Sequence, residues 1–490
     1  MLAKAFMTKS DYKLLPVILA GLCIWLISAF FSDGYYQADE HFQILEFANY
    51  KLGNISSQML PWEFSEQMRP GFQPLLAFLI IKSCSFIGIT SPFTQVLCMR
   101  MITALLAFGV TAYFLRRIKA EYGSALRQFF LWSLLFFLWF MPLLVVRFSS
   151  ENLSGICMLL SLALIMLPQE KVSARGFLLA GIIAGLAFLF RYQSAIMIAG
   201  LFFWMLIIQK PGWKKSVFFL AGLIVVCGCG FFADRWLYGE WVCAPWNYFS
   251  NNLLMDKLSS FGTKPWHHYF TSGTEQLLFP VGLVVWISAA VFWITKSRSA
   301  LTWISIPFVL FHVLLSHKEV RFLFPLFYLI PVFILQAAVV LSKVGVFRKK
   351  WMQISLIAAF LFLNLAVLSV FLTKTMERNI GVLHQVHQSG TGQKLLYYNE
   401  GNPSNPFGIP YYFYLTHDIT SVKVNDSLQQ IPLPSSSDTT VFLYEEMRGI
   451  NYRTDANSTL MMCKFPAFLR PLNLGHWQER TANWALYRIK

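Results

Sequence analysis

The chain contains repeated apolar runs that are each long enough, or nearly so, to cross a bilayer as a helix. A bilayer core needs about 20 consecutive apolar residues, with a range near 17 to 25. Because such runs continue as far as residue 372, the first is not a cleaved signal peptide, and we expect a polytopic membrane protein. The twelve runs cover residues 14–31, 72–89, 98–115, 129–146, 153–168, 176–190, 194–208, 216–232, 277–294, 300–315, 322–342 and 353–372.

The composition agrees with this expectation. Of 490 residues, 56% are hydrophobic and 13% are charged, whereas a soluble protein carries about 25% charged residues. This balance excludes a disordered chain and a fibrous protein. The eight cysteines are too sparse for a secreted disulfide scaffold, and most of them lie in apolar runs.

The net charge of +16 comes almost entirely from a few short segments. These segments and the N-terminus, with Lys4, Lys9 and Lys13, hold eighteen Lys and Arg and three acidic residues, which gives +15. Short basic loops mark the cytoplasmic side of a membrane protein. The charge therefore reflects topology, and we expect no nucleic-acid partner. The basic loops are 116–128, 169–175, 209–215, 295–299 and 343–352.

The same rule fixes the expected topology. Residues 32–70 are acidic and are expected outside; if run 72–89 crossed the membrane, the basic loop 116–128 would also lie outside. Lys82 within that run favours a helix at the interface instead. The prediction is an all-α polytopic protein with about eleven transmembrane helices (residues 1–372), followed by a small mixed α/β extracytoplasmic domain (residues 373–490).

The first external loop (residues 32–97) carries Ala38-Asp39-Glu40-His41-Phe42-Gln43 and Glu46. Asp39 is placed to cap a helix. One interpretation is a capped helix with a solvated acidic face. The other is a carboxylate at the membrane surface that deprotonates an acceptor hydroxyl. Asp-Glu-His alone is a weak metal signal, and we predict no metal site.

Other polar residues fall on the same predicted face. Arg191 occupies an external turn, where it either binds a ligand or extends to the headgroups. The large loop 234–276 is aromatic, which suits either a membrane belt or a sugar pocket. His317-Lys318-Glu319-Val320-Arg321 places cations around one acid, which suits either an anionic phosphate or a local ion network.

These blocks resemble the Alg9-like mannosyltransferases, glycosyltransferase family 22 of the GT-C class. The resemblance rests on the first-loop motif with Trp62-Glu63, on Gly262-Thr263-Lys264-Pro265-Trp266-His267-His268-Tyr269-Phe270 and on His317 to Pro325. The last two blocks are most similar to the third mannosyltransferase of glycosylphosphatidylinositol-anchor assembly. Ala38 and Arg69-Pro70 depart from the family pattern.

The resemblance implies an inverting transfer of a hexose, most simply mannose, from a polyprenyl- or dolichyl-phosphate sugar to a hydroxyl of a lipid-linked or surface glycan. It needs no cofactor. We assign Asp39 as general base, with Glu40 as second choice. The donor phosphate is assigned to His317, Lys318, Arg321, Arg191 and His267, and the sugar or acceptor to Trp62, Glu63, Trp266 and His268.

This assignment places the N-terminus in the cytoplasm and the active site and C-terminus outside it, in a bacterial inner membrane or, in a eukaryote, the endoplasmic reticulum. Three alternatives stay open: a transporter or flippase of lipid-linked sugars, a non-catalytic scaffold, and a GT-C transferase with a different sugar or acceptor. A transporter predicts charges in mid-membrane and repeated halves. The charges here gather on one face, and the sequence shows no clear repeat.

Overall fold

The computed structural model describes residues 11–166, 172–389, 392–415, 418–424, 439–454 and 456–490. Lys4, Lys9 and part of the basic loop 169–175 lie outside the described residues. The chain forms two compact units. The first comprises residues 1–32, 61–87 and 96–374; the second comprises residues 33–60, 88–95 and 375–490.

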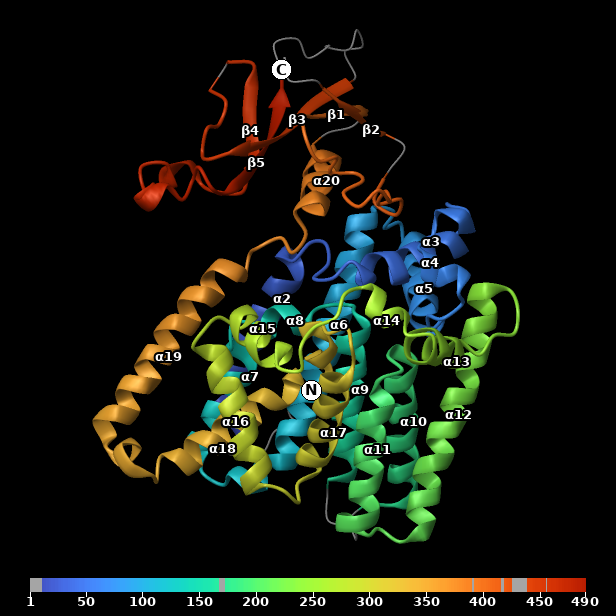
Figure 1. The fold of residues 1–490 in the computed structure, drawn as a ribbon, viewed down its shortest axis with the longest axis vertical. Coiled ribbons are helices and arrows are strands. Elements are labelled where there is room, and N and C mark those ends of the chain that lie inside the picture. The colour runs from blue at the N-terminus through green and yellow to red at the C-terminus, as the bar shows by residue number, and fades with distance from the viewer. Residues whose placement is uncertain (1–10, 167–171, 390–391, 416–417, 425–438, 455) are drawn as a thin grey trace. The chain divides into compact units, whose positions relative to one another are not determined.

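The first unit is built from apolar helices (Figure 1). Within the described residues, four are long and apolar enough to cross a membrane: α6 (Pro92–Ile118), α12 (Trp213–Tyr238), the segment Val320–Leu341 that contains α18 (Ile330–Leu341), and α19 (Lys350–Phe371). The predicted helical membrane protein is confirmed, while the number of spanning helices stays a prediction. Shorter apolar helices are α2 (Leu15–Phe31), α5 (Phe72–Phe86), α7 (Ala125–Phe137), α9 (Ser150–Ile165), α10 (Ala174–Phe190), α11 (Ser194–Trp204), α16 (Val281–Thr295) and α17 (Ala300–Leu314).

Glycines set the spacing of α10 and α12, which lie side by side in Figure 1. A Cβ atom on Gly181 would lie 1.9 Å from the carbonyl oxygen of Phe219, and one on Gly222 would lie 2.3 Å from that of Leu178. Helices in lipid gain stability by close backbone approach at small residues, because lipid offers no hydrophobic drive between them. These two positions therefore require glycine.

The predicted run 129–146 is not one helix. Helix α7 ends at Phe137 and a short helix α8 (Met141–Val145) follows. Pro142 lies in the first turn of α8, where proline is tolerated because its missing backbone donor is not needed there. Asn364 of α19 binds the backbone groups that the break leaves without helical partners. Its side-chain amide donates to the Phe137 carbonyl at 2.6 Å, and its side-chain oxygen accepts from the Trp139 amide at 2.8 Å.

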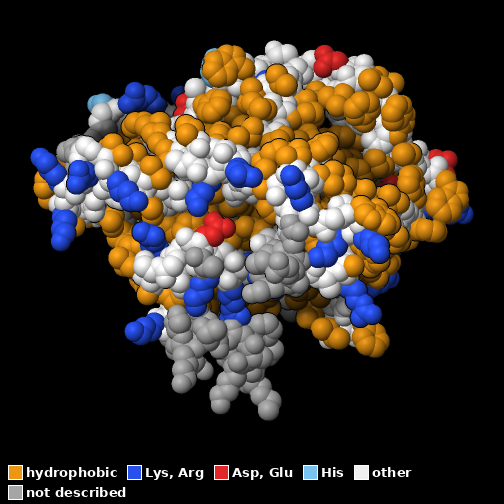
Figure 2. Space-filling model, turned by 90° about the horizontal axis from the view of Figure 1, so that it is seen from below, with side chains coloured by type: hydrophobic (Ala, Val, Ile, Leu, Met, Phe, Trp, Pro, Cys, Tyr) orange, Lys and Arg blue, Asp and Glu red, His pale blue; other side chains and the backbone are white. Residues whose placement is uncertain are grey.

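One face of the first unit is rich in cations. Figure 2 shows Lys and Arg side chains with few acidic ones on the face seen from below, among exposed apolar side chains. Such a mixture suits basic groups at the headgroups beside lipid-facing helices. Which side of the membrane this face occupies stays a prediction.

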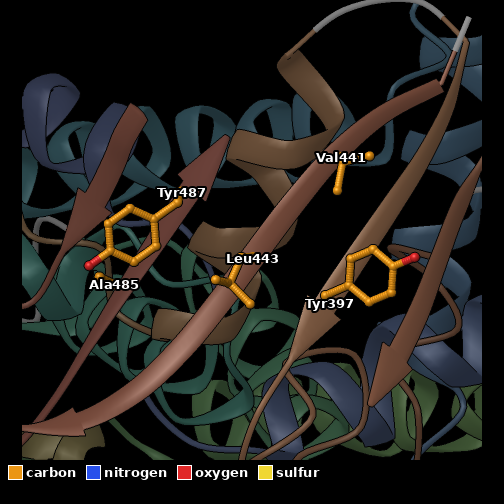
Figure 3. Packing of buried hydrophobic residues seen from close by; sticks show 5 residues of the cluster. All are labelled: Tyr397, Val441, Leu443, Ala485 and Tyr487. Carbon is orange, nitrogen blue, oxygen red and sulfur yellow. The ribbon is translucent and has the colours of Figure 1, made fainter. Parts of the chain in front are cut away.

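The second unit contains a five-stranded mixed sheet in the order β2-β1-β3-β5-β4, as predicted for the C-terminal region. Strands β1–β2 and β1–β3 pair in parallel, and β3–β5 and β4–β5 antiparallel. One face packs around Tyr397, Leu443 and Tyr487 (Figure 3). The strands are β1 (Gln393–Tyr398), β2 (Ile419–Lys423), β3 (Thr439–Arg448), β4 (Ser458–Cys463) and β5 (Ala482–Ile489).

Candidate functional site

A buried network of charges links three helical segments of the first unit. Arg191, the residue after α10, pairs with Glu151 of α9 at 2.7 Å. Arg321 lies 3.9 Å from the same carboxylate and 2.6 Å from Glu319, which also holds His317 at 3.0 Å. We call these five residues the cation network. Its three predicted phosphate ligands, Arg191, Arg321 and His317, are therefore brought together.

Arg191 does not extend to headgroups, so that alternative is wrong. Its side chain is 7% exposed, and its guanidinium lies 5.3 Å from the ring of Phe322. Its Nε and Nη2 groups are buried and have no hydrogen-bond partner among the described residues. Buried donors without partners cost free energy. The network therefore presents N–H groups that suit an anionic ligand.

Lys318 lies next to the cation network in sequence, but its side chain binds backbone carbonyls instead of a carboxylate. Its side chain is buried, and its Nζ donates to the carbonyls of Lys264 and Leu315. His317 Nδ1 lies 2.9 Å from the Gly262 carbonyl oxygen. Burial lowers the pKa of Lys318. Lys318 and His317 therefore tie loop 262–264 to the segment before residue 320.

Trp62 reaches the same region through an aromatic contact. In α4 (Trp62–Ser65), it stacks on Phe261 at 6.0 Å, and Phe261 lies 6.0 Å from the ring of His317. Glu63, next in that helix, pairs with Arg69 at 3.4 Å. Trp62 thus presents an aromatic face next to the Glu63 carboxylate.

Helix α12 positions the segment after α4. Asp234 accepts a hydrogen bond from the Gly71 amide at 2.8 Å, and Tyr238 donates one to the Arg69 carbonyl at 2.8 Å. A Cβ atom on Gly71 would lie 2.4 Å from the Ala233 carbonyl oxygen. Glycine at position 71 is thus what permits this close approach to α12.

The remaining predicted ligands, Trp266, His267 and His268, lie just before α15 (His268–Gln276) and at its first residue. Trp266 and His267 are exposed and pack edge to face at 5.5 Å. His268 is half-buried, and its Nδ1 lies 3.2 Å from the Ser272 hydroxyl. Burial lowers the pKa of His268, and the charges of Lys264 and Lys318 lower it further. His268 is thus a neutral imidazole near neutral pH.

Two buried groups of this region were missed by sequence reasoning. Glu151 anchors Arg191, but its partner lies 40 residues away along the chain. Tyr269 is fully buried and its hydroxyl has no hydrogen-bond partner among the described residues. Burial raises the pKa of Tyr269, although the Arg191 charge and the nearby Glu319 backbone amide oppose that rise. The phenol therefore stays protonated and can donate.

Asp39 and Glu40 belong to the second unit. Asp39 precedes a short π-helix, η2 (Glu40–Leu45), but its side chain makes no capping hydrogen bond. The expected cap is wrong: Glu40 instead accepts from the Tyr36 and Gln37 amides at 3.1 and 3.4 Å. π-Helical turns are rare and occur frequently at functional sites.

The expected solvated acidic face is also wrong. Glu46 is 2% exposed and lies 2.8 Å from His41, which is 1% exposed. Among the described residues, no group of three or more His, Cys, Asp or Glu is arranged to hold a metal ion. The acidic first loop thus packs inward through Glu46.

The fold is that of a known class of membrane protein. The crystal structure of ArnT from Cupriavidus metallidurans bound to undecaprenyl phosphate matches with a TM-score of 0.55 at 11% identity, covering 97% of this chain and 98% of that one. This chain thus has a GT-C-like fold.

Comparison of the sequence identifies the family within this fold class. Residues 17–416 match the profile of the Alg9-like mannosyltransferase family, and the chain belongs to that family. It is 27% identical to mannosyltransferase APTG1 of Arabidopsis thaliana over 63% of this chain and 56% of that protein. It is 26% identical to GPI alpha-1,2-mannosyltransferase 3 of Xenopus laevis over 63% of this chain and 57% of that protein. The chain thus spans little more than half the length of these relatives.

Proposed function

We propose that this chain is a membrane mannosyltransferase that uses a polyprenyl-phosphate mannose donor and a glycan or glycolipid hydroxyl as acceptor. The observation that carries the proposal is Arg191, whose buried guanidinium has two N–H groups without a partner among the described residues. Membership of the family and the names of its relatives support mannose as the sugar.

The charges near Arg191 favour a phosphate ligand. Arg191, Arg321 and Lys318 supply three cations, whereas Glu151 and Glu319 supply two carboxylates. An anion with oxygens at hydrogen-bonding distance would balance this excess and satisfy the unpartnered Arg191 donors. The ArnT structure holds undecaprenyl phosphate, which is a polyprenyl phosphate like the lipid of the proposed donor.

In the proposed reaction, the acceptor oxygen attacks C1 of the sugar while the bond from C1 to the phosphate oxygen breaks. The bonding electron pair leaves with the phosphate, where Arg191 and Arg321 stabilise the charge. Phosphate is a good leaving group, so one general base suffices, unlike the paired carboxylates of glycosidases. The acceptor proton passes to that base.

Asp39 stays the first candidate for this base, and Glu40 the second. One oxygen of Glu40 accepts hydrogen bonds from the amides of Tyr36 and Gln37. Through these bonds, Glu40 fixes the backbone that leads into the π-helix. Trp62, Glu63, His268 and Trp266 stay proposed as the sugar and acceptor side of the site, and His267 as a phosphate contact.

The test is mannose transfer by the purified chain in detergent from synthetic polyprenyl-phosphate mannose. We expect release of polyprenyl phosphate, with losses of about 100-fold or more in Asp39→Asn and Arg191→Gln. Arg453→Gln is the matched control, since Arg453 pairs with Glu445 in the C-terminal sheet at 3.0 Å. Equal activity in Arg191→Gln would contradict the phosphate assignment. Translocation of the lipid without turnover would favour a flippase.

A further inference from the structure

The three chain segments of the second unit meet in a stack of four rings. His41 stacks on Tyr414 with ring centres 5.4 Å apart, Tyr414 on Phe93 at 4.9 Å, and Phe93 on His384 at 4.5 Å. His41 belongs to residues 33–60, Phe93 to residues 88–95, and the other two to residues 375–490. We call these four side chains the ring stack.

A carboxylate lies beside the imidazole at each end of the ring stack. Asp33 lies 2.5 Å from His384, and Glu46 lies 2.8 Å from His41. The His41 contact is an ion-pair distance, since neither ring nitrogen of His41 makes a hydrogen bond with a described residue. Glu46 also accepts the Phe413 amide at 3.0 Å and the Asn49 side-chain amide at 3.0 Å. The buried Glu46 carboxylate thus accepts two hydrogen bonds and has the His41 ring beside it, and losing a partner in a buried place is costly.

The π-helix is what brings His41 and Glu46 together. The Glu46 amide donates to the His41 carbonyl, a bond between residues five apart. In an α-helix, residues at this spacing do not share a face, whereas the wider turn places one above the other. The His41–Glu46 pair therefore stabilises the π-turn from its side chains, and the π-turn begins directly after Asp39.

We propose that His41 and Glu46 are positioning residues for the transfer reaction, which hold Asp39 in one orientation through the π-helix. They do not touch the substrate. The proposal rests on the proposed function, in which Asp39 is the base. His41 anchors the first turn to the C-terminal segment through Tyr414, and Glu46 anchors the last turn through Phe413.

The test is a double-mutant cycle between Glu46 and Asp39 in mannose transfer. Glu46→Gln keeps the size of the side chain and an acceptor for the Phe413 amide but loses the charge facing His41. We expect kcat to fall by up to about 100-fold, as for a small misplacement of a catalytic group, with the KM for the donor lipid little changed. In single-turnover assays on Asp39→Asn, adding Glu46→Gln should have almost no further effect.

Glu445→Gln is the matched control, because Glu445 is an ion-paired carboxylate of the same unit outside the ring stack. We expect it to keep the wild-type kcat. An unchanged kcat in Glu46→Gln, or an equal loss in the Asp39→Asn background, overturns the positioning role. If Glu46→Gln does not fold, His41→Gln tests the same pair. A wild-type chain that turns over no lipid-phosphate sugar and binds no polyprenyl phosphate refutes the proposed function itself.

Discussion

At the scale of single residues, removing the hydroxyl of Tyr269 should affect ligand binding without lowering the stability of the protein. The hydroxyl is buried and donates to no described residue, so Tyr269→Phe removes a donor without an acceptor and should leave the melting temperature unchanged or slightly raised. If the hydroxyl donates to the donor phosphate, the same variant should show a smaller stabilisation by added undecaprenyl phosphate. Thermal unfolding in detergent, with and without the lipid, measures both effects.

Tyr328 provides the matched control for that prediction. Its buried hydroxyl donates to the side-chain oxygen of Asn152 at 2.7 Å. Tyr328→Phe should therefore destabilise the protein by about 1–3 kcal/mol, because it leaves a buried acceptor unpaired. Equal losses of stability in the two variants would show that the Tyr269 hydroxyl is also bonded within the protein.

His268 makes stability depend on pH in a definite direction. Its pKa in the folded protein is lowered by burial and by neighbouring lysines, whereas an unfolded histidine titrates near about 6.5. The unfolded chain therefore binds a proton that the folded chain resists, and stability falls as pH drops below about 6.5. His268→Gln should reduce the loss of melting temperature between pH 7.5 and 5.5. An identical pH dependence in the variant would contradict this role.

At the scale of elements, the α10–α12 contact predicts opposite effects for two glycine substitutions. Gly181→Ala places a Cβ atom 1.9 Å from the Phe219 carbonyl oxygen, which must separate the helices and destabilise the fold by at least about 1–3 kcal/mol. In Gly228→Ala, on the same α12, the Cβ meets nothing within 4 Å. That variant should be neutral or more stable by up to about 1 kcal/mol. Unfolding of both in detergent compares them directly.

At the scale of the whole molecule, the predicted orientation can be tested with single cysteines. The native cysteines are replaced, and one cysteine is placed at exposed Ser297 in a basic loop or at exposed Thr459 in β4. We expect an impermeant maleimide to label position 459 from outside intact cells or from the lumenal side, and position 297 only from the cytoplasm. The reverse pattern would contradict the predicted topology.

The helical membrane fold could be predicted from the apolar runs of the sequence, because membrane insertion depends on local composition. The break between α7 and α8 could not be, because the Asn364 amide that permits it lies more than 220 residues away. In the same way, the burial of Arg191 depends on Glu151, and that of Glu46 on the Phe413 amide. Local patterns identified these polar residues, but only the tertiary structure shows which of them are buried within the protein.

The second unit is assembled from segments far apart in the chain, and this has a consequence for its folding during synthesis. Residues 33–60 are made early, yet the Phe413 amide that Glu46 binds and the ring of Tyr414 come from the segment after residue 374. Phe413 follows Glu46 by 367 residues, and at about 5–20 residues per second these take roughly 18–73 s to translate. The ribosome must therefore finish almost the whole chain before this early segment can fold, which leaves it a long window for capture by a chaperone or a protease.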